Sequence, residues 1–281
     1  MTGPLLAFDT STPVGSVAVG RGEEILARGL LLRPGEHASL LLPRITEILE
    51  EAELGRDDLG GVVVGRGPGS FTGVRIAAAT ARGLTAALDV PLWTFSSLAA
   101  GAASWDASIP EALARRPGFH FVDLPEGSER WPRYVLFDAR GERVYGGCYR
   151  FHPDRMEVLT EPRADTLSGL LESDLPEGTV FCGDGALRHA PFLEERGHMV
   201  LPFPAGLPTG EGLLRVLHLS PGADPEARGS RWEPDYLRGG RIARSGGGER
   251  RARAGGAGPG EQGSRGGGVG PGGPGSEPEG P

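Results

Sequence analysis

The sequence predicts an α/β fold made of two related units, each with a mixed sheet and helices. Two observations support this prediction. The order strand, strand, strand, helix, strand, helix occurs twice along the 281 residues, and the second copy is the less regular one. The first turn of each unit also carries an aspartate, Asp9 in the first and Asp138 in the second. Such repetition is typical of duplicated α/β proteins, so we expect two lobes around a cleft, the second lobe degenerate.

The first unit opens with a β-meander. Apolar runs bounded by turn residues predict strands at 5–8, 14–19 and 25–31. Val62, Val63 and Val64 predict a buried strand, because β-branched side chains fit a pleated surface that is covered on both faces. A further strand is expected at 89–95, followed by a short helix at 98–103.

The helix expected at 37–54 has a broad apolar stripe, with glutamates facing outward. The stripe consists of Leu41, Leu42, Ile45, Ile48, Leu49 and Ala52. Pro43 either lies in the first turn of this helix or kinks it. His37 could act as a ligand or a base, but a lone histidine without a second ligand at metal spacing is more often a surface or capping residue.

A glycine-rich loop at 65–75 joins the valine strand to a second helix, expected at 73–88. Gly65, Gly67 and Gly69, with Pro68, end the strand in a tight turn. Thr72 is expected to cap the helix, where backbone N–H groups and the positive end of the helix dipole favour an anion. The alternative is that the glycines serve close packing alone.

The second helix carries small residues at intervals of four, which would let another helix approach closely. Together the two helices form either a surface for a partner protein or ordinary core. The residues expected to bind the partner are Leu41, Leu42, Ile45, Leu49, Val74, Ala77, Ala81 and Leu84.

The turn at 9–12 presents a carboxylate and three hydroxyls. These groups could hold a metal-bound phosphate or a ribose hydroxyl, or they could hydrogen-bond within their own turn. The candidate nucleotide-binding residues, from this turn and the glycine-rich loop, are Asp9, Ser11, Gly67, Gly69 and Thr72. With Asp138 across the cleft, they support an alternative function, an independent nucleotide-dependent phosphotransferase.

The second unit is expected to have strands at 134–137, 144–151, 156–160 and 179–182, and helices at 167–172 and 209–219. The chain therefore divides into a first lobe at 1–104, a proline-containing connector or insertion at 105–133, a second lobe at 134–238 and a tail at 239–281. The tail is rich in Gly, Pro and Arg and is expected to be disordered. Its Arg250, Arg251 and Arg253 could touch RNA, although a solvated tail is the favoured interpretation.

Composition excludes several classes of function. The net charge of -8 argues against a protein that grips nucleic acid through its own basic face. No lysine occurs, which excludes Schiff-base chemistry and a Walker-type phosphate loop. Cys148 and Cys182 show neither metal-ligand spacing nor a disulfide framework. The start lacks a basic n-region and no apolar run approaches the ~20 residues of a membrane span, so we expect a cytoplasmic protein without a membrane partner.

Several motifs together resemble the TsaB (YeaZ-type) family, accessory subunits of the bacterial machinery that makes threonylcarbamoyladenosine in tRNA. The resemblance covers about Leu5 to Arg238, and the loop at 65–75 is its most specific part. The residues that carry it are Asp9-Thr-Ser-Thr12, Ser16-Val-Ala-Val19, the loop Gly65-Arg-Gly-Pro-Gly-Ser-Phe-Thr-Gly-Val-Arg75, the stretch 91–100, Asp138-Ala-Arg140, Glu142-Arg-Val-Tyr145 and Pro234-Asp-Tyr-Leu-Arg238.

The resemblance implies the duplicated actin-like, sugar-kinase and Hsp70-type (ASKHA) fold. It also implies a scaffold or activator subunit without catalytic residues of its own. Such a subunit pairs through the two helices flanking the loop with a catalytic homologue, TsaD, and a TsaE-type ATPase completes the assembly. It would reach tRNA only through the complex and could form a homodimer when the partner is absent. No cofactor is required, with ATP or ADP at the partner interface as the candidate ligand.

One departure from the TsaD branch supports the non-catalytic interpretation. That branch has two histidines, four residues apart, that hold a metal, whereas this chain has Ser97 and Gly101 at the matching positions. Neither residue supplies an imidazole, so we expect no metal site there. The same absence argues against a metallopeptidase, because a zinc hydrolase needs about three protein ligands. The connector is longer than the family pattern needs, and the tail has no counterpart in that pattern.

Overall fold

The computed structural model describes residues 3–104, 127–139, 141–172, 174–227, 232, 234, 237–238 and 241–242. Residues 1–245 form one compact unit, which holds all of these residues. Most of the expected connector, 105–126, lies outside the described residues. So does the expected tail beyond 242, including the three arginines at 250, 251 and 253.

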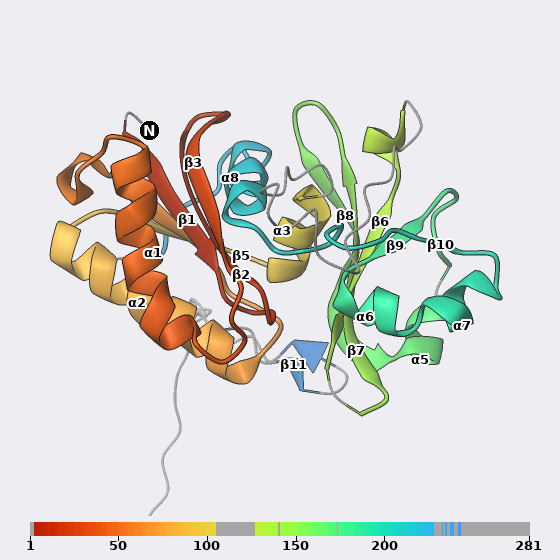
Figure 1. The fold of residues 1–281 in the computed structure, drawn as a ribbon. Helices are drawn as coiled ribbons and strands as arrows, with labels where there is room; N and C mark the ends of the chain where they lie inside the picture. The colour runs from red at the N-terminus through yellow and green to blue at the C-terminus, as the bar shows by residue number, and fades with distance from the viewer. Residues whose placement is uncertain are drawn as a thin grey trace, which may run out of the picture. The chain divides into compact units, whose positions relative to one another are not determined.

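The first sheet has five strands in the order β3-β2-β1-β4-β5 (Figure 1). Its strands are β1 (Leu5–Asp9), β2 (Gly15–Arg21), β3 (Glu24–Leu31), β4 (Gly61–Gly65) and β5 (Leu92–Phe95). The first three form an antiparallel meander, and β4 and β5 run parallel to β1. All five strands were predicted from the sequence, because each is an apolar run bounded by turn residues.

The second sheet repeats this arrangement in the order β10-β9-β6-β7-β8. Its strands are β6 (Arg133–Asp138), β7 (Arg143–Phe151), β8 (Met156–Thr166), β9 (Val180–Cys182) and β10 (Met199–Val200). Again the first three are an antiparallel meander, and the last two run parallel to the first of them. Two sheets with the same order and directions confirm the expected duplicated ASKHA-type α/β fold.

Two long helices cover one face of the first sheet: α1 (His37–Glu51) and α2 (Phe71–Leu88) (Figure 1). Their buried side chains join those of β1, β2 and β4 in one core cluster. Pro43 lies in the interior of α1 rather than in its first turn. The 3-10 helix η1 (Arg56–Asp58) connects α1 to β4.

The two halves of the chain exchange a helix across their junction. Helix α3 (Ser97–Ala103) follows the first sheet in sequence, yet its apolar side chains pack on the second sheet with Val135 and Phe137. Helix α8 (Gly210–His218) follows the second sheet, yet Leu213 and Leu214 pack on the first sheet. The two exchanged helices also contact each other. Each sheet is therefore covered on its inner face by a helix from the other half.

Short helices cover the other face of the second sheet. They are α5 (Leu167–Leu171), α6 (Asp184–Arg188) and α7 (Ala190–Glu194), and the 3-10 helix η2 (Ser128–Arg130) precedes β6. Helices α6 and α7 and strand β10 were not predicted from the sequence. Five-residue helices show too little of the 3.6-residue period to be recognised from pattern.

Strand β8 continues to Thr166, six residues beyond the expected end at 160. The expected end at 160 is therefore wrong, and the observed strand includes a proline, Pro162. Proline is tolerated on edge strands and at bulges. Strand β8 pairs only with β7 in its sheet, and the β7–β8 register shifts between Gly146 and Cys148, opposite Pro162.

The end of the described chain returns to the first sheet. The N–H of Glu226 donates to the Leu92 carbonyl at 2.7 Å, and Trp232 packs against the core beneath α1 and α2. Strands β11 (Leu237–Arg238) and β12 (Arg241–Ile242) then form a small antiparallel hairpin. Within the tail expected from residue 239 onward, residues 241–242 pair with 237–238 in this hairpin.

None of the helices within the described ranges has the length and apolar character needed to span a bilayer.

Candidate functional site

The glycine-rich loop between β4 and α2 ends at a serine cap. The hydroxyl of Ser70 accepts a hydrogen bond from the N–H of Gly73 at 3.3 Å, and the helix begins at Phe71. The expected cap, Thr72, is wrong. Thr72 lies instead at the second helical position, where its N–H has no acceptor within the helix.

Asp9, at the end of β1, is buried beneath this loop. Its Oδ1 accepts hydrogen bonds from the N–H of Ser11 at 2.7 Å and the Ser11 hydroxyl at 2.6 Å, and its Oδ2 accepts one from the Ser97 hydroxyl at 2.6 Å. Ser97 Oγ in turn accepts from the N–H of Gly67 at 3.0 Å. Burial raises the pKa of the Asp9 carboxyl, although the bonds from Ser11 and Ser97 oppose that effect. Asp9 therefore ties β1, the loop and α3 together.

Three glycines let the loop and α2 lie directly against residues 9–11. A Cβ atom at Gly65 would overlap the Asp9 carboxylate, one at Gly69 would overlap the Ser11 carbonyl, and one at Gly73 would overlap the Thr10 carbonyl. Gly69 also has a φ of 156°, which side chains rarely adopt. The close-packing interpretation of the glycines is therefore supported by the geometry.

A cavity of about 290 Å³ opens beside this packed corner. Of the five candidate nucleotide-binding residues, Ser11, Gly69 and Thr72 line it. Asp9 and Gly67 do not, because they lie in the buried hydrogen-bond cluster just described. The phosphotransferase alternative needs an aspartate at the phosphate, and here both oxygens of Asp9 are already used by the protein.

The second half of the chain supplies another wall of the cavity, with Phe137, Asp138 and Asp184. The Oδ1 of Asp138 pairs with Arg188 at 2.6 Å. The Oδ1 of Asp184 accepts from the N–H groups of Gly185 at 2.9 Å and Asp138 at 3.3 Å. Burial raises the pKa of Asp184, and the nearby Asp138 carboxylate adds to this rise. Asp138 was identified from the sequence as a candidate residue, whereas Asp184 was not.

His37, at the start of α1, also lines the cavity and is only 6% exposed. Its Nε2 lies 3.0 Å from the Thr12 carbonyl, which can only accept, so Nε2 carries a proton. Its Nδ1 is buried without a hydrogen-bond partner among the described residues. The expectation of a surface residue is wrong, because the ring is folded against the turn at 9–12.

Six of the eight residues expected to bind a partner lie in the chain's own interior, none of them more than 8% exposed. They are Leu41, Ile45, Leu49, Val74, Ala77 and Ala81. Leu84 is half-buried, whereas Leu42 is 52% exposed. A partner would therefore meet the opposite sides of α1 and α2. We call this the outer face; its exposed residues include Leu42, Thr46, Phe71, Arg75, Ala79 and Gly83.

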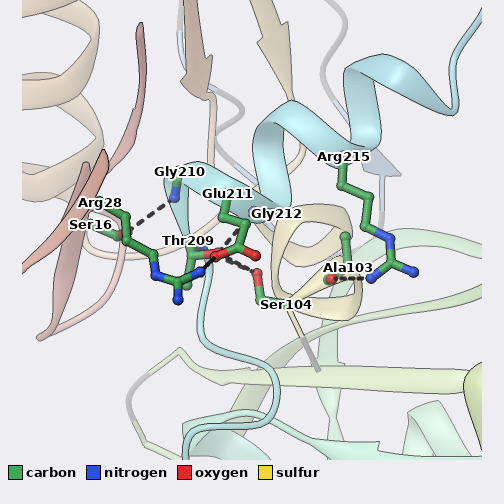
Figure 2. Close-up of polar contacts among 9 residues, drawn as sticks. All are labelled: Ser16, Arg28, Ala103, Ser104, Thr209, Gly210, Glu211, Gly212 and Arg215. Atoms are coloured by element: carbon green, nitrogen blue, oxygen red, sulfur yellow. Dashed lines mark hydrogen bonds and ion pairs between the residues drawn. The ribbon is translucent and has the colours of Figure 1, made fainter. Parts of the chain in front are cut away.

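Polar groups join the two halves at the first turn of α8 (Figure 2). Thr209 caps the helix by accepting from the N–H of Gly212 at 2.9 Å, and its hydroxyl lies 2.7 Å from that of Ser104. Other bonds link Ser16 to Gly210, Arg28 to Glu211 and Arg215 to Ala103. This junction holds α8 on the first sheet. Of its residues, only Ser16 was named from the sequence, as part of the family resemblance.

The positions that match the metal-binding histidines of the TsaD branch are both filled by packing. Ser97 is committed to Asp9, and a Cβ at Gly101 would overlap the Gly206 carbonyl. Within the described part of the chain, no group of three or more His, Cys, Asp or Glu side chains could hold a metal ion. Cys148 and Cys182 are buried free thiols, and burial raises the pKa of each to about 12.

Comparison with known proteins places the chain in a family. Residues 34–182 match the family model described as TsaD, tRNA N6-adenosine threonylcarbamoyltransferase. The tRNA threonylcarbamoyladenosine biosynthesis protein TsaB of Bacillus subtilis is 30% identical over 195 residues, which cover 68% of this chain and 75% of that protein. The TsaB of Escherichia coli is 38% identical over 174 residues, covering 59% of this chain and 68% of that protein. The chain belongs to the TsaB (YeaZ-type) family.

A solved structure agrees with this membership of the TsaB family. A protein from Pseudomonas aeruginosa described as similar to the peptidase YeaZ is 27% identical and superposes with a TM-score of 0.64. The superposition covers 84% of this chain and all of that one. A second structure, YeaZ from the same organism, has a TM-score of 0.59 and covers 76% of this chain. The TsaB-like arrangement therefore extends over both sheets rather than one half.

Proposed function

We propose that this chain is a non-catalytic subunit that takes part in making threonylcarbamoyladenosine in tRNA. In this proposal it binds a TsaD-type catalytic homologue through the outer face of α1 and α2 and supports threonylcarbamoyl transfer to the adenosine next to the anticodon. A TsaE-type ATPase and tRNA would join through the complex. The observation that carries the proposal is membership of the TsaB family, whose named relatives are biosynthesis proteins for this nucleoside.

The outer face of α1 and α2 has the chemistry of a protein contact. Leu42 and Phe71 are each 52% exposed, an unusual degree for large apolar side chains. The guanidinium of Arg75 lies 3.6 Å from the centre of the Phe71 ring and holds it in place. Ala79 and Gly83, one turn apart on α2, are exposed and small, so another helix could approach the backbone closely there.

The non-catalytic part of the proposal rests on the hydrogen bonds of Asp9 and on the close packing at Gly101. Asp9 is held by three hydrogen bonds from Ser11 and Ser97, so it does not reach the cavity. Gly101 has no room for any side chain beside the Gly206 carbonyl. A histidine introduced there would displace backbone, so a metal pair at 97 and 101 is sterically disfavoured in this chain.

The test is a double substitution, Ala79→Arg with Gly83→Arg, assayed by co-purification with the TsaD homologue of the same host. Both positions are exposed, and a Cβ at Gly83 meets nothing within 4 Å, so the subunit should stay folded. Two arginines on a small-residue face should block close approach and weaken the complex by at least about tenfold. Ala77 and Ala81 are unsuitable for this test, because both are fully buried.

Glu195→Arg, exposed beside α7, is the matched control because it changes the net charge by the same amount. It should leave complex formation unchanged. An unaltered complex with the double variant would contradict the proposed surface. Repeating the co-purification with ATP and with ADP shows whether a nucleotide contributes at the partner interface. Sedimentation of the chain alone shows whether it forms a homodimer.

A further inference from the structure

The four outer strands of the two sheets differ in what limits their pairing with another chain. The outer strands of the first sheet are β3 and β5, and those of the second sheet are β10 and β8. An outer strand presents unpaired backbone N–H and C=O groups. Proteins limit pairing there with charged side chains, proline, bulges, very short strands or a covering segment. The four strands can therefore be compared by which of these features each one has.

Three of the four outer strands carry such a feature in their own residues. Strand β3 has two exposed charged residues, Glu24 and Arg28. Strand β8 has charged residues, Pro162 and a register shift against β7. Strand β10 has only two residues. A second chain would meet charge, an irregular backbone or too short a strand at each of these three edges.

Strand β5 is the exception. It consists of Leu92-Trp-Thr-Phe95, four uncharged residues without a proline, and its pairing with β4 shows no register shift. Aromatic and β-branched residues such as these favour strand pairing. By its own residues, β5 is therefore the outer strand best suited to accept another strand.

A segment that follows α8 covers the backbone groups of β5 that face away from β4. The carbonyls of Pro91 and Phe95 accept hydrogen bonds on the β4 side, at 2.9 and 2.8 Å. Because backbone groups alternate in direction along a strand, those of Leu92 and Thr94 face outward. The N–H of Glu226 donates to the Leu92 carbonyl at 2.7 Å, and its carboxylate accepts from the Thr94 hydroxyl at 2.7 Å. One residue thus holds both outward-facing positions.

The same segment lies between the two faces of the first sheet. The indole N–H of Trp93 donates to the Ala223 carbonyl at 3.2 Å, in the core cluster that includes α8. Trp232 packs against the cluster beneath α1 and α2, on the other face. Pro221 and Pro225 have no N–H to donate, so the segment does not offer a continuous row of donors to a further strand. We call residues 221–227 the edge strap.

We propose that the edge strap keeps β5 from pairing with a second copy of this chain, and that its release makes the chain self-associate edge to edge. The second copy fits as the occupant because β5 is uncharged, so two β5 strands meet without like-charge repulsion. Antiparallel pairing of one strand with its own copy is a closed two-fold contact, which gives a dimer rather than a fibre. This contact does not involve the outer face of α1 and α2, so it can be tested separately from the proposed function.

The experiment is sedimentation of the full chain, with Ala79→Arg and Gly83→Arg present throughout to suppress association through the outer face. Glu226→Pro removes the N–H donor and the carboxylate that hold the strap on β5. Over about a hundredfold range of concentration, this variant should form a dimer of about twice the mass of the monomeric parent. Amide hydrogen exchange at 220–227 should become faster when the variant is dilute, because the strap is released.

Three further variants show whether the association depends on the β5 edge. Glu226→Ala keeps the N–H donor and should associate less than Glu226→Pro. Asp224→Ala, exposed on the same strap, removes the same charge and should stay monomeric. Thr94→Lys added to Glu226→Pro places a charge on the edge and should restore the monomer, which would not happen if the chain were merely destabilised. A monomeric Glu226→Pro, an association that Thr94→Lys fails to reverse, or equal association of Asp224→Ala overturns the proposal.

Discussion

The two halves of the chain share one strand order but differ in the helices on their outer faces. After its third strand the first half has the 15-residue α1, whereas the second half has the 5-residue α5. After its fourth strand the first half has the 18-residue α2, and the second half has α6 and α7 with 5 residues each. The exchanged helices α3 and α8 are similar in length, with 7 and 9 residues.

This difference separates structural from functional parts of the fold. The sheets and the exchanged helices occur in both halves because each half needs the other's helix to cover its sheet. The helices on the other faces of the two sheets do not have to cover the opposite half. Helices α1 and α2 are therefore long and present the outer face, whereas α5, α6 and α7 are short. We therefore expect substitutions to lower the free energy of unfolding most where the loop at 65–75 packs against residues 9–11 in the first half.

The largest effect is expected at Gly65. Gly65→Ala places a methyl group on the buried Asp9 carboxylate and beside Ser97, and should lower the free energy of unfolding by about 3 kcal/mol. Gly83→Ala, on α2 in the same half, meets nothing within 4 Å and should raise it by about 1 kcal/mol. Urea unfolding measures both. A loss at Gly65 no larger than the change at Gly83 would show that the corner relaxes freely.

An intermediate loss of unfolding free energy is expected when the helix caps are removed. Thr209 caps α8 at the buried junction, and Thr209→Ala should cost about 1–2 kcal/mol because it also strips Ser104 of a partner. Thr166 caps the short α5 in the second half and is exposed, so Thr166→Ala should cost about 0.5 kcal/mol. Thermal unfolding compares them, with Thr209→Ser as the conservative control. Equal costs would argue that the junction is not the tighter of the two sites.

The smallest effect concerns pH. Burial raises the pKa of Asp9 in the folded chain above the ordinary 3.8, so between these two pKa values the folded state holds a proton that the unfolded state lacks. Stability from this group should therefore fall as pH rises through that window. Asp184 contributes with the same sign from the second half.

Asp9→Asn should flatten the pH dependence more than Asp184→Asn does, because Asp9 is 1% exposed and Asp184 is only partly buried. Urea unfolding between about pH 4 and about pH 7 measures the slopes. Asp154→Asn, which removes one exposed charge, should leave the slope unchanged. A steeper slope in Asp9→Asn would contradict the assigned sign.

Much of the architecture could be predicted from sequence because the strands are apolar runs with turn residues at their ends. The duplication was visible for the same reason. Helical periodicity identified the apolar stripe of α1 and α2 correctly, yet it does not say what covers that stripe. From the sequence, Leu41 and Ala77 could therefore belong either to a partner surface or to the core. In the structure both are buried in the core.

The candidate site was harder to predict from sequence patterns, because its contacts join residues that are far apart in the sequence. Ser97 reaches Asp9 across 88 positions and Asp184 reaches the N–H of Asp138 across 46. Nothing local marks Ser97 or Asp184 as a partner. Ser70 could have been found, since a serine three residues before Gly73 is a common helix cap, but Thr72 offered the same chemistry nearer the expected start.

The exchange of α3 and α8 also constrains how the chain can fold during synthesis. The inner face of the first sheet, which includes Leu5, Val63 and Trp93, is covered by α8, and α8 ends at His218. A ribosome that has made the first half has therefore made a sheet with one apolar face open to water. Domains usually fold in the order of their synthesis. Here the inner face of the first sheet stays uncovered until α8 has been made, so the emerging chain depends on its own final third to keep that face from aggregating.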